Sequence, residues 1–229
     1  MVFCIACLIS VRVYAWSSEG ASQVPVAPTP GSQKPEGESR NSLTLFGTAT
    51  FANNSFYAQT FDRHLSLVGL RYGRLLSRNR FLSVRYVPEI IPAAVLSEPS
   101  VDGIALPRRV PHLTGTEYVY GVGANPVGFE LLFAPAGKIR PFLSTNEGFL
   151  YFRRNVPSFF AAQFNFAADV RAGASIRLNG ERTISFAYVF HHFSNAFEAR
   201  DNPGVDSQMI YVGYTFSFRR RHASRVKEP

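Results

Sequence analysis

Apolar and polar residues alternate along most of the chain from Leu43 onward, and this alternation restricts the fold more than any other feature. A period of two places successive side chains on opposite faces of a β-strand. No helical period is sustained, and no apolar run is long enough to cross a membrane as a helix. The sequence therefore predicts an all-β, antiparallel fold with strands at Leu43–Phe51, His64–Leu76, Arg80–Ile90, Tyr120–Phe133, Arg140–Phe152, Phe164–Arg177, Arg182–His192 and Gln208–Phe218.

The two faces of these strands differ in chemistry. In Phe164–Arg177 one face carries Phe164, Phe166 and Val170, whereas the other carries Asp169 and Arg171. A soluble sandwich would carry many Lys and Glu residues on its polar face, but here that face combines small polar residues with charges of both signs. A narrow polar interior in which buried charges pair would explain this pattern. We assign seven charged residues to that interior: Arg71, Arg85, Arg171, Glu89, Glu130, Glu147 and Asp169.

The connections between the predicted strands alternate in length. Long connections at 52–63, 91–119, 153–163 and 193–207 are separated by short ones around 77–79, 134–139 and 179–181. Short turns at one end and long loops at the other are typical of bacterial outer-membrane β-barrels, which have an even number of strands. The alternative is a soluble, lipocalin-like barrel, which does not require this segregation of loops. We therefore predict an eight-stranded outer-membrane barrel over residues 43–218.

The regions outside the barrel have their own compositions. Residues 1–15 begin with an apolar run and end in a small-x-small pattern, as in a secretory signal peptide. Residues 16–42 are rich in Pro, Ser and Gly and predict a flexible linker, and residues 219–229 form a basic tail. Cys4 and Cys7 both lie in the first apolar run, so removal of a signal peptide would leave no cysteine for a disulfide or metal site.

Composition and charge exclude several classes of protein. With 46% hydrophobic and 17% charged residues, the chain is neither a disordered polymer nor a coiled coil. Its net charge of +8 comes in large part from the basic tail, and the sequence contains no nucleic-acid-binding motif. Nucleic acid is therefore not an expected partner.

A histidine and a serine near the end of the seventh predicted strand could carry chemistry. His192 and Ser194 are two residues apart, which places them on one strand face about 6.5–7 Å apart at their Cα atoms. Parity assigns them to the lipid-facing side, where polar groups are costly and usually functional. A serine becomes a good nucleophile when a histidine takes its proton and a carboxylate orients that histidine. Glu198, Asp201 and Asp206 are the nearby acids, and a polar girdle without catalytic activity is the simpler alternative.

A metal site is not expected at this histidine pair. His191 and His192 point to opposite faces of the strand, so their rings are poorly placed for joint ligation. We expect His191 to point into the barrel and to have a structural role. No cofactor is predicted.

The segment His-Phe-Ser-Asn-Ala at 192–196, followed by Asn-Pro-Gly at 202–204 and a final aromatic strand, resembles the lipid A 3-O-deacylase (PagL-like) or acyloxyacyl hydrolase family. This resemblance implies an eight-stranded outer-membrane barrel with its catalytic triad on the outer surface. It assigns His192 as the base, Ser194 as the nucleophile and Asn195 to the oxyanion hole. The acid falls on Asp206, where well-known members have Glu, and Phe197 stands where a glycine is often found.

These observations predict an outer-membrane serine esterase that removes an acyl chain from lipid A, with lipopolysaccharide of the outer leaflet as its partner. Arg153, Arg154 and Arg200 are expected near the outer ends of strands, where they could bind headgroup phosphates. Two alternatives remain open: an inactive structural or adhesive barrel, and an esterase that acts on phospholipid. The sequence does not predict an oligomeric state.

Overall fold

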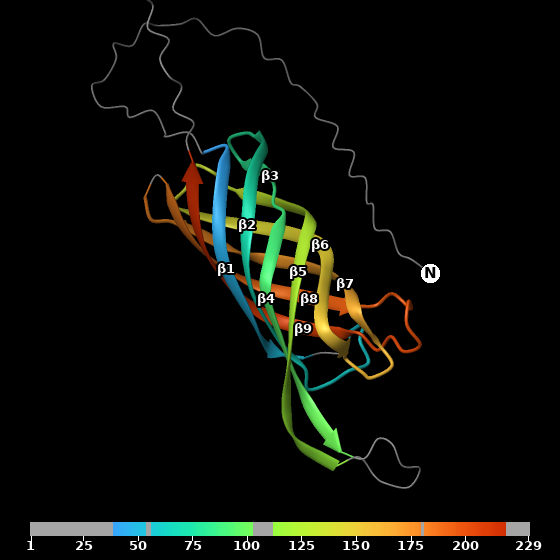
Figure 1. Cartoon of the computed structure of the whole chain (residues 1–229). Coiled ribbons are helices and arrows are strands. Elements are labelled where there is room, and N and C mark those ends of the chain that lie inside the picture. The colour runs from blue at the N-terminus through green and yellow to red at the C-terminus, as the bar shows by residue number, and fades with distance from the viewer. Residues whose placement is uncertain (1–38, 54–55, 103–111, 180, 219–229) are drawn as a thin grey trace, which may run out of the picture. The chain divides into compact units, whose positions relative to one another are not determined.

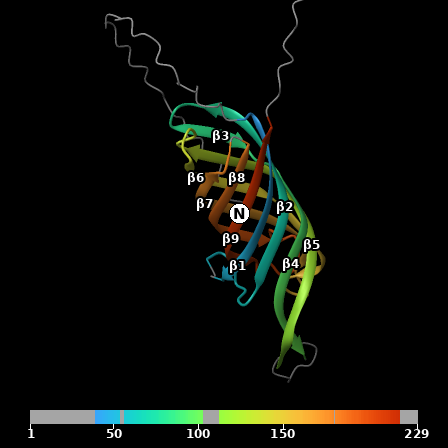
Figure 2. The ribbon, with the colours of Figure 1, turned by 90° about the vertical axis from the view of Figure 1, so that its left-hand side faces the viewer.

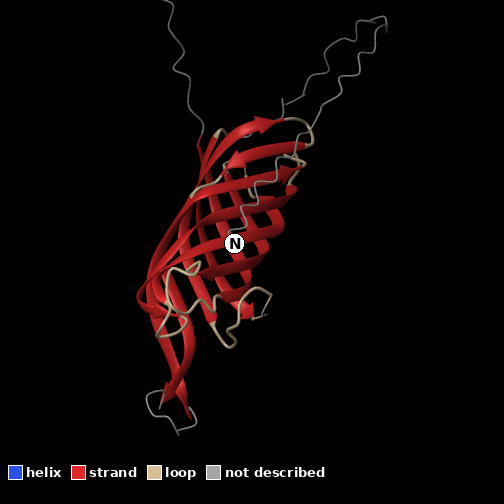
Figure 3. Ribbon diagram, turned by 90° about the vertical axis from the view of Figure 1, so that its right-hand side faces the viewer, coloured by secondary structure: helices blue, strands red, loops and turns tan. Residues whose placement is uncertain are grey.

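The computed structural model describes residues 39–53, 56–102, 112–179 and 181–218. These residues form β-strands and loops, without helices (Figure 3). The strands are β1 (Asn41–Ala52), β2 (His64–Arg78), β3 (Leu82–Tyr86), β4 (Glu89–Asp102), β5 (His112–Phe133), β6 (Ile139–Val156), β7 (Ala162–Arg177), β8 (Arg182–Ser194) and β9 (Val205–Phe218). The described part of the chain contains no helix that is long and apolar enough to span a membrane.

The strands close into an antiparallel ring (Figures 1 and 2). Closure occurs at β1, which pairs with β2 on one side and with β9 on the other. β3 and β4 each pair with β2 on one side and with β5 on the other. β3 and β4 therefore occupy one position between β2 and β5, and the nine strands form a ring of eight positions. The interruption falls at residues 87–88, where Pro88 has no N–H to donate to a neighbouring strand. The predicted eight-stranded antiparallel barrel is confirmed.

The second of the four predicted long connections is wrong over most of its length. Where a loop was expected at 91–119, β4 continues to Asp102, and β5 begins at His112. The two strands form a ribbon that extends beyond the rest of the barrel (Figure 1). Register shifts between Ile91 and Ala94, and between Ser100 and Val101, break the period of two that would have marked these strands in the sequence.

Several other strands extend past a predicted boundary, among them β6 to Val156, β8 to Ser194 and β9 from Val205, because backbone pairing continues where the apolar alternation stops. The connections 53–63, 157–161 and 195–204 lie at the same end of the barrel as the ribbon, which we call the long-loop end. The connections 79–81, 134–138 and 178–181 lie at the opposite, short-turn end. At the beginning of the barrel, β1 starts at Asn41, two residues before the predicted boundary. The predicted signal peptide, most of the linker and the basic tail lie outside the described residues.

Buried ion pairs fill the middle of the barrel. Arg171 donates to both oxygens of Glu89 at 2.8 and 2.9 Å and to Asp169 at 2.8 Å. Arg71 binds Glu89 at 2.7 Å and Glu130 at 3.2 Å. Toward the long-loop end the interior is apolar, with side chains that include Leu65, Leu96, Val119, Leu150, Phe152 and Phe193. The interior therefore accommodates its charges by pairing them, as the sequence predicted.

Glu147 does not belong to this interior set, so its predicted place is wrong. In the first half of β6 the buried positions are Arg140, Phe142, Ser144 and Asn146, and Glu147 is exposed on the outer face. The sequence interpretation grouped it with the interior charges because opposite charges were available to pair with it. Strand parity decides its direction instead, since neighbouring residues point to opposite faces.

Candidate active site

β8 presents two polar residues on an apolar outer face. Phe186 and Tyr188 are exposed there, whereas Val189, His191 and Phe193 are buried inside the barrel. His192 and Ser194 continue the outward series and are half-buried. The structure therefore gives these residues the predicted orientations: His192 and Ser194 outward and His191 inward.

Asp206 is the acid that contacts His192. The pairing of β8 with β9 sets His192 opposite Asp206, and the histidine Nδ1 lies 2.6 Å from the carboxylate Oδ1. The Asp206 side chain is 1% exposed, whereas that of His192 is 28% exposed. A carboxylate at Nδ1 holds the ring in the tautomer whose Nε2 lone pair can accept a proton. This arrangement leaves Nε2 of His192 available to accept a proton.

The other two nearby acids have different surroundings. Asp201 accepts a hydrogen bond from Ser158 at 2.6 Å, which links the loops 157–161 and 195–204. Glu198 is exposed, and neither acid is bonded to His192 in the described residues. Of the three acids near the histidine, the structure brings only Asp206 to it.

The loop 53–63 holds the second oxygen of Asp206. Its Oδ2 accepts backbone N–H bonds from Phe56 at 2.7 Å, Tyr57 at 2.5 Å and Ala58 at 2.9 Å. The Tyr57 ring also packs edge-on against His192, with 5.9 Å between ring centroids. Sequence reasoning missed this loop because backbone donors leave no residue signature. The three bonds fix the carboxylate that orients His192.

Gly204 lets the returning loop pass close to His192 and Ser194. Its φ of +64° is in the left-handed region, which glycine adopts without steric cost. A Cβ atom at this position would lie 3.2 Å from His192 Cε1 and 3.5 Å from Ser194 Cβ. The loop is also tied to 53–63, because Gln59 N–H donates to the Pro203 carbonyl at 2.7 Å and Thr60 donates to the Gly204 carbonyl. His192 and Ser194 therefore both approach this one glycine.

Ser194 and Asn195, which follow His192 at the end of β8, differ in their hydrogen bonding. The Ser194 hydroxyl makes no hydrogen bond with any residue that the structure describes. Asn195 is 1% exposed, and its Nδ2 donates to the Asp201 carbonyl at 2.7 Å. Its Oδ1 accepts the Phe197 N–H at 3.0 Å. The Asn195 side chain thus shapes the loop behind the serine, with one Nδ2 hydrogen already engaged.

The turn after Asn195 carries backbone strain. Ala196 and Phe197 have φ values of +52° and +66°, in the region that favours glycine. A non-glycine residue there costs about 1–2 kcal/mol. This explains structurally why a glycine suits position 197, where the sequence has Phe.

Phe197→Gly is therefore expected to raise the free energy of unfolding by about 1 kcal/mol, after allowance for the greater freedom of glycine in the unfolded chain. Phe197 is 81% exposed, so little packing is lost. Urea unfolding of the barrel in detergent micelles measures this change. The matched control is Phe159→Gly, because Phe159 is 80% exposed but has no positive φ, and this variant should lose stability. A lower free energy of unfolding for Phe197→Gly than for the wild-type protein would contradict the inference that the backbone at Phe197 is strained.

The three predicted phosphate-binding arginines have different surroundings. Arg154 is bound by Glu98 at 2.5 Å and by Glu117 at 2.9 Å. Arg153 lies over the Tyr120 ring at 5.6 Å, and Arg200 lies over the Phe160 ring at 5.1 Å. Neither Arg153 nor Arg200 has a carboxylate partner among the described residues, whereas two carboxylates neutralise Arg154.

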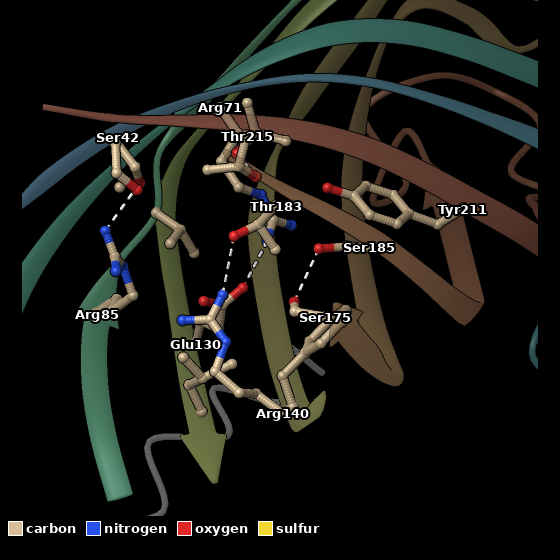
Figure 4. A pocket seen from close by; sticks show the side chains of 16 residues that line it. Ser42, Arg71, Arg85, Glu130, Arg140, Ser175, Thr183, Ser185, Tyr211 and Thr215 are labelled. Carbon is tan, nitrogen blue, oxygen red and sulfur yellow. Dashed lines mark hydrogen bonds and ion pairs between the residues drawn. The ribbon is translucent and has the colours of Figure 1, made fainter. Parts of the chain in front are cut away.

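An interior cavity lies apart from these residues (Figure 4). It has a volume of about 50 Å³ and is lined by Arg71, Arg85, Arg140, Glu130 and many hydroxyl groups. None of its lining residues belongs to the segment 190–206. Among the described residues, no group of three or more His, Cys, Asp or Glu side chains is arranged to hold a metal ion. The outer face of β8 and β9, which carries His192, Ser194 and Asp206, is the candidate active site.

Comparison with known proteins finds one family model and several solved structures that are similar to this chain. The family model of lipid A 3-O-deacylase (PagL) matches residues 107–215, which include His192, Ser194 and Asp206. The crystal structure of the outer-membrane enzyme PagL matches with a TM-score of 0.53 and 17% identity, over 76% of this chain and 99% of that chain. A search of curated protein sequences finds no significant match.

Two further solved structures match with lower TM-scores. Neisserial surface protein A matches with a TM-score of 0.44 and 13% identity, over 80% of this chain and 100% of that chain. OprG from Pseudomonas aeruginosa matches with a TM-score of 0.46 and 11% identity, over 81% of this chain and 99% of that chain. The family model of PagL thus matches just under half of this chain, and the PagL crystal structure shares its β-barrel fold.

Proposed function

We propose that this protein is a serine esterase that removes the acyl chain ester-linked at position 3 of lipid A. The observation that carries the proposal is the 2.6 Å contact between His192 Nδ1 and Asp206 Oδ1, on an outer face that also carries Ser194. A barrel with only a structural role has no need for an oriented histidine and a serine where its wall meets lipid. The family match adds the substrate class.

In the proposed mechanism His192 acts as the base and Ser194 as the nucleophile. His192 Nε2 takes the hydroxyl proton of Ser194 as Oγ attacks the ester carbonyl. The bond to the sugar oxygen then breaks, and His192 returns the proton to that oxygen as the sugar leaves. Water, deprotonated by His192, attacks the acyl-enzyme, which releases the fatty acid and restores the serine.

The proposal also assigns a donor to the oxyanion, explains the unbonded Ser194 hydroxyl and selects the arginines that contact phosphate. The second Nδ2 hydrogen of Asn195 is the proposed side-chain donor to the oxyanion. Hydrogen bonds between nucleophile and base are often long in unliganded enzymes and tighten with substrate, which accommodates the unbonded Ser194 hydroxyl. Arg153 and Arg200, which lack carboxylate partners among the described residues, are the stronger candidates for phosphate contacts.

The proposed topology brings the site to its substrate. If β1 runs outward from the periplasm, the long-loop end faces the cell exterior, as in other barrels of this type. β8 then carries His192 and Ser194 to the level of the outer leaflet, which holds the lipopolysaccharide. The ester next to the sugar could meet Ser194 without leaving the membrane.

Mass spectrometry of lipid A from cells with and without the protein tests the proposal. Expression should remove one ester-linked 3-hydroxyacyl chain and release the matching free fatty acid, and the Ser194→Ala protein should remove none. Unchanged lipid A, together with shortened phospholipids, would replace the proposal with a phospholipid esterase. No change in either lipid class would favour the structural or adhesive barrel.

A further inference from the structure

An acidic side chain lies on the outer face of the barrel, close to the candidate active site. Glu147 is exposed, and its outward-facing neighbours on the adjoining strands are Val127 on β5 and Ala168 on β7. Its carboxylate makes no hydrogen bond or ion pair with any residue that the structure describes. Charged groups on the lipid face destabilise a barrel, and ionisable groups within a membrane usually mark a functional site.

The strand register aligns Glu147 with His192. Glu147 pairs with Ala168, Ala168 pairs with His192, and His192 pairs with Asp206, so these residues form one row across four strands. Neighbouring strands lie about 4.8 Å apart, which puts the Cα atoms of Glu147 and His192 roughly 10 Å apart. Only the methyl group of Ala168 stands between them on the outer face. The carboxylate and the histidine therefore lie on the same outer face, on either side of Ala168.

The two residues also lie at similar depth. Glu147 is the ninth residue of β6 counted from the short-turn end, and His192 is the eleventh residue of β8 counted from the same end. A β-bulge in β5 adjoins Glu147, since the register shifts between Ala124 and Val127. Gly148 accommodates the bulge, because a Cβ there would lie 2.0 Å from the Ala124 carbonyl oxygen. Bulges occur often beside active sites, where they redirect side chains.

We propose that Glu147, with Ala168 beside it, forms a second recognition point for the substrate, and that its carboxylate accepts a hydrogen bond from a hydroxyl or amide N–H of the acylated glycolipid. Such a donor would lie within about 10 Å of the ester held at Ser194. An ester that lacks hydroxyl and amide groups would gain nothing from this contact. The inference rests on the proposed function, since it describes the same site.

Binding of purified lipid A tests the inference without catalysis. In a Ser194→Ala background, Glu147→Leu is expected to weaken lipid A binding by about 10- to 100-fold, because a hydrogen bond to a charged acceptor is lost. The matched control is Thr145→Val, the preceding outward position of β6, which should bind as the background protein does. Glu147→Gln keeps an acceptor oxygen and should retain most of the binding.

The active enzyme supplies the second arm of the test. Glu147→Leu should lower kcat/KM on lipid A by a similar factor and leave hydrolysis of p-nitrophenyl decanoate, which has no hydroxyl or amide, unchanged. Lipid A binding unaffected by Glu147→Leu, or an equal loss on both substrates, would overturn the inference. If Glu147→Gln loses as much lipid A binding as Glu147→Leu, the group that Glu147 contacts is a cation and not a hydroxyl or amide N–H, which would overturn the proposed hydrogen bond. Absence of lipid A deacylation by the wild-type protein would instead count against the proposed function, and the binding arm would still decide the role of Glu147.

Discussion

Ser194→Ala and His192→Asn are each expected to lower the rate of lipid A deacylation by about 10⁴- to 10⁶-fold, because nucleophile and base act as a unit. Both side chains lie on the outer face of β8, so neither substitution removes a buried contact of the barrel interior. Release of fatty acid from lipid A in detergent measures the rate. Heat-modifiable mobility in electrophoresis establishes that each variant is a folded barrel.

His191→Ala is the matched control for these variants. His191 is adjacent in sequence but 2% exposed inside the barrel, so its loss should leave the rate within a few-fold of wild type. Near-wild-type activity of Ser194→Ala would falsify the assignment of the nucleophile. An active His192→Asn protein together with an inactive His191→Ala protein would show that the base acts from inside the barrel.

Asp206→Asn is expected to lower the rate by about 10²- to 10⁴-fold, as occurs when a carboxylate that fixes a histidine tautomer is replaced. The asparagine can still accept backbone N–H bonds from the loop 53–63 through its oxygen. The introduced asparagine then presents its NH₂ group as a donor to His192 Nδ1, which favours the tautomer with the proton on Nε2. In that tautomer Nε2 cannot take the proton of Ser194, so His192 no longer acts as a base. Measurement of kcat at saturating lipid A separates this effect from weaker substrate binding.

The other two acids serve as controls for this assignment. Glu198→Gln should leave the rate unchanged, because Glu198 is exposed and not bonded to His192 in the described residues. Asp201→Asn should have a small effect that acts through the loop, since Asp201 binds Ser158. A Glu198→Gln protein impaired as severely as Asp206→Asn would move the acid to position 198.

The outward direction of His192 and Ser194 could be predicted because it depends on parity along one strand. Side chains two residues apart share a face whatever the rest of the fold, so the neighbours Phe186 and Tyr188 already marked that face as apolar. The same reasoning predicted His191 inside. Glu147 obeys the same rule: it follows the buried Asn146 and is exposed on the outer face, so its predicted place in the interior was wrong.

The partner of His192 could not be predicted from local pattern. Three acids follow Ser194 within twelve residues of sequence, and the length of the loop leaves all three within reach. The choice depends on the register of β8 against β9 and on three N–H groups from a loop about 150 residues away along the chain. Backbone donors are common to almost all residues, so no side-chain pattern marks them.

The sequence by itself determined the class of the molecule: an eight-stranded barrel with an apolar exterior, paired charges inside, and a histidine and serine directed outward. These properties follow from a period of two, which is local and survives errors in strand boundaries. The tertiary structure alone decided that β4 and β5 extend beyond the barrel, that Asp206 is the acid at His192, and that Glu147 shares a row with it. Those outcomes depend on register between strands, and register is set by contacts between residues far apart in the chain.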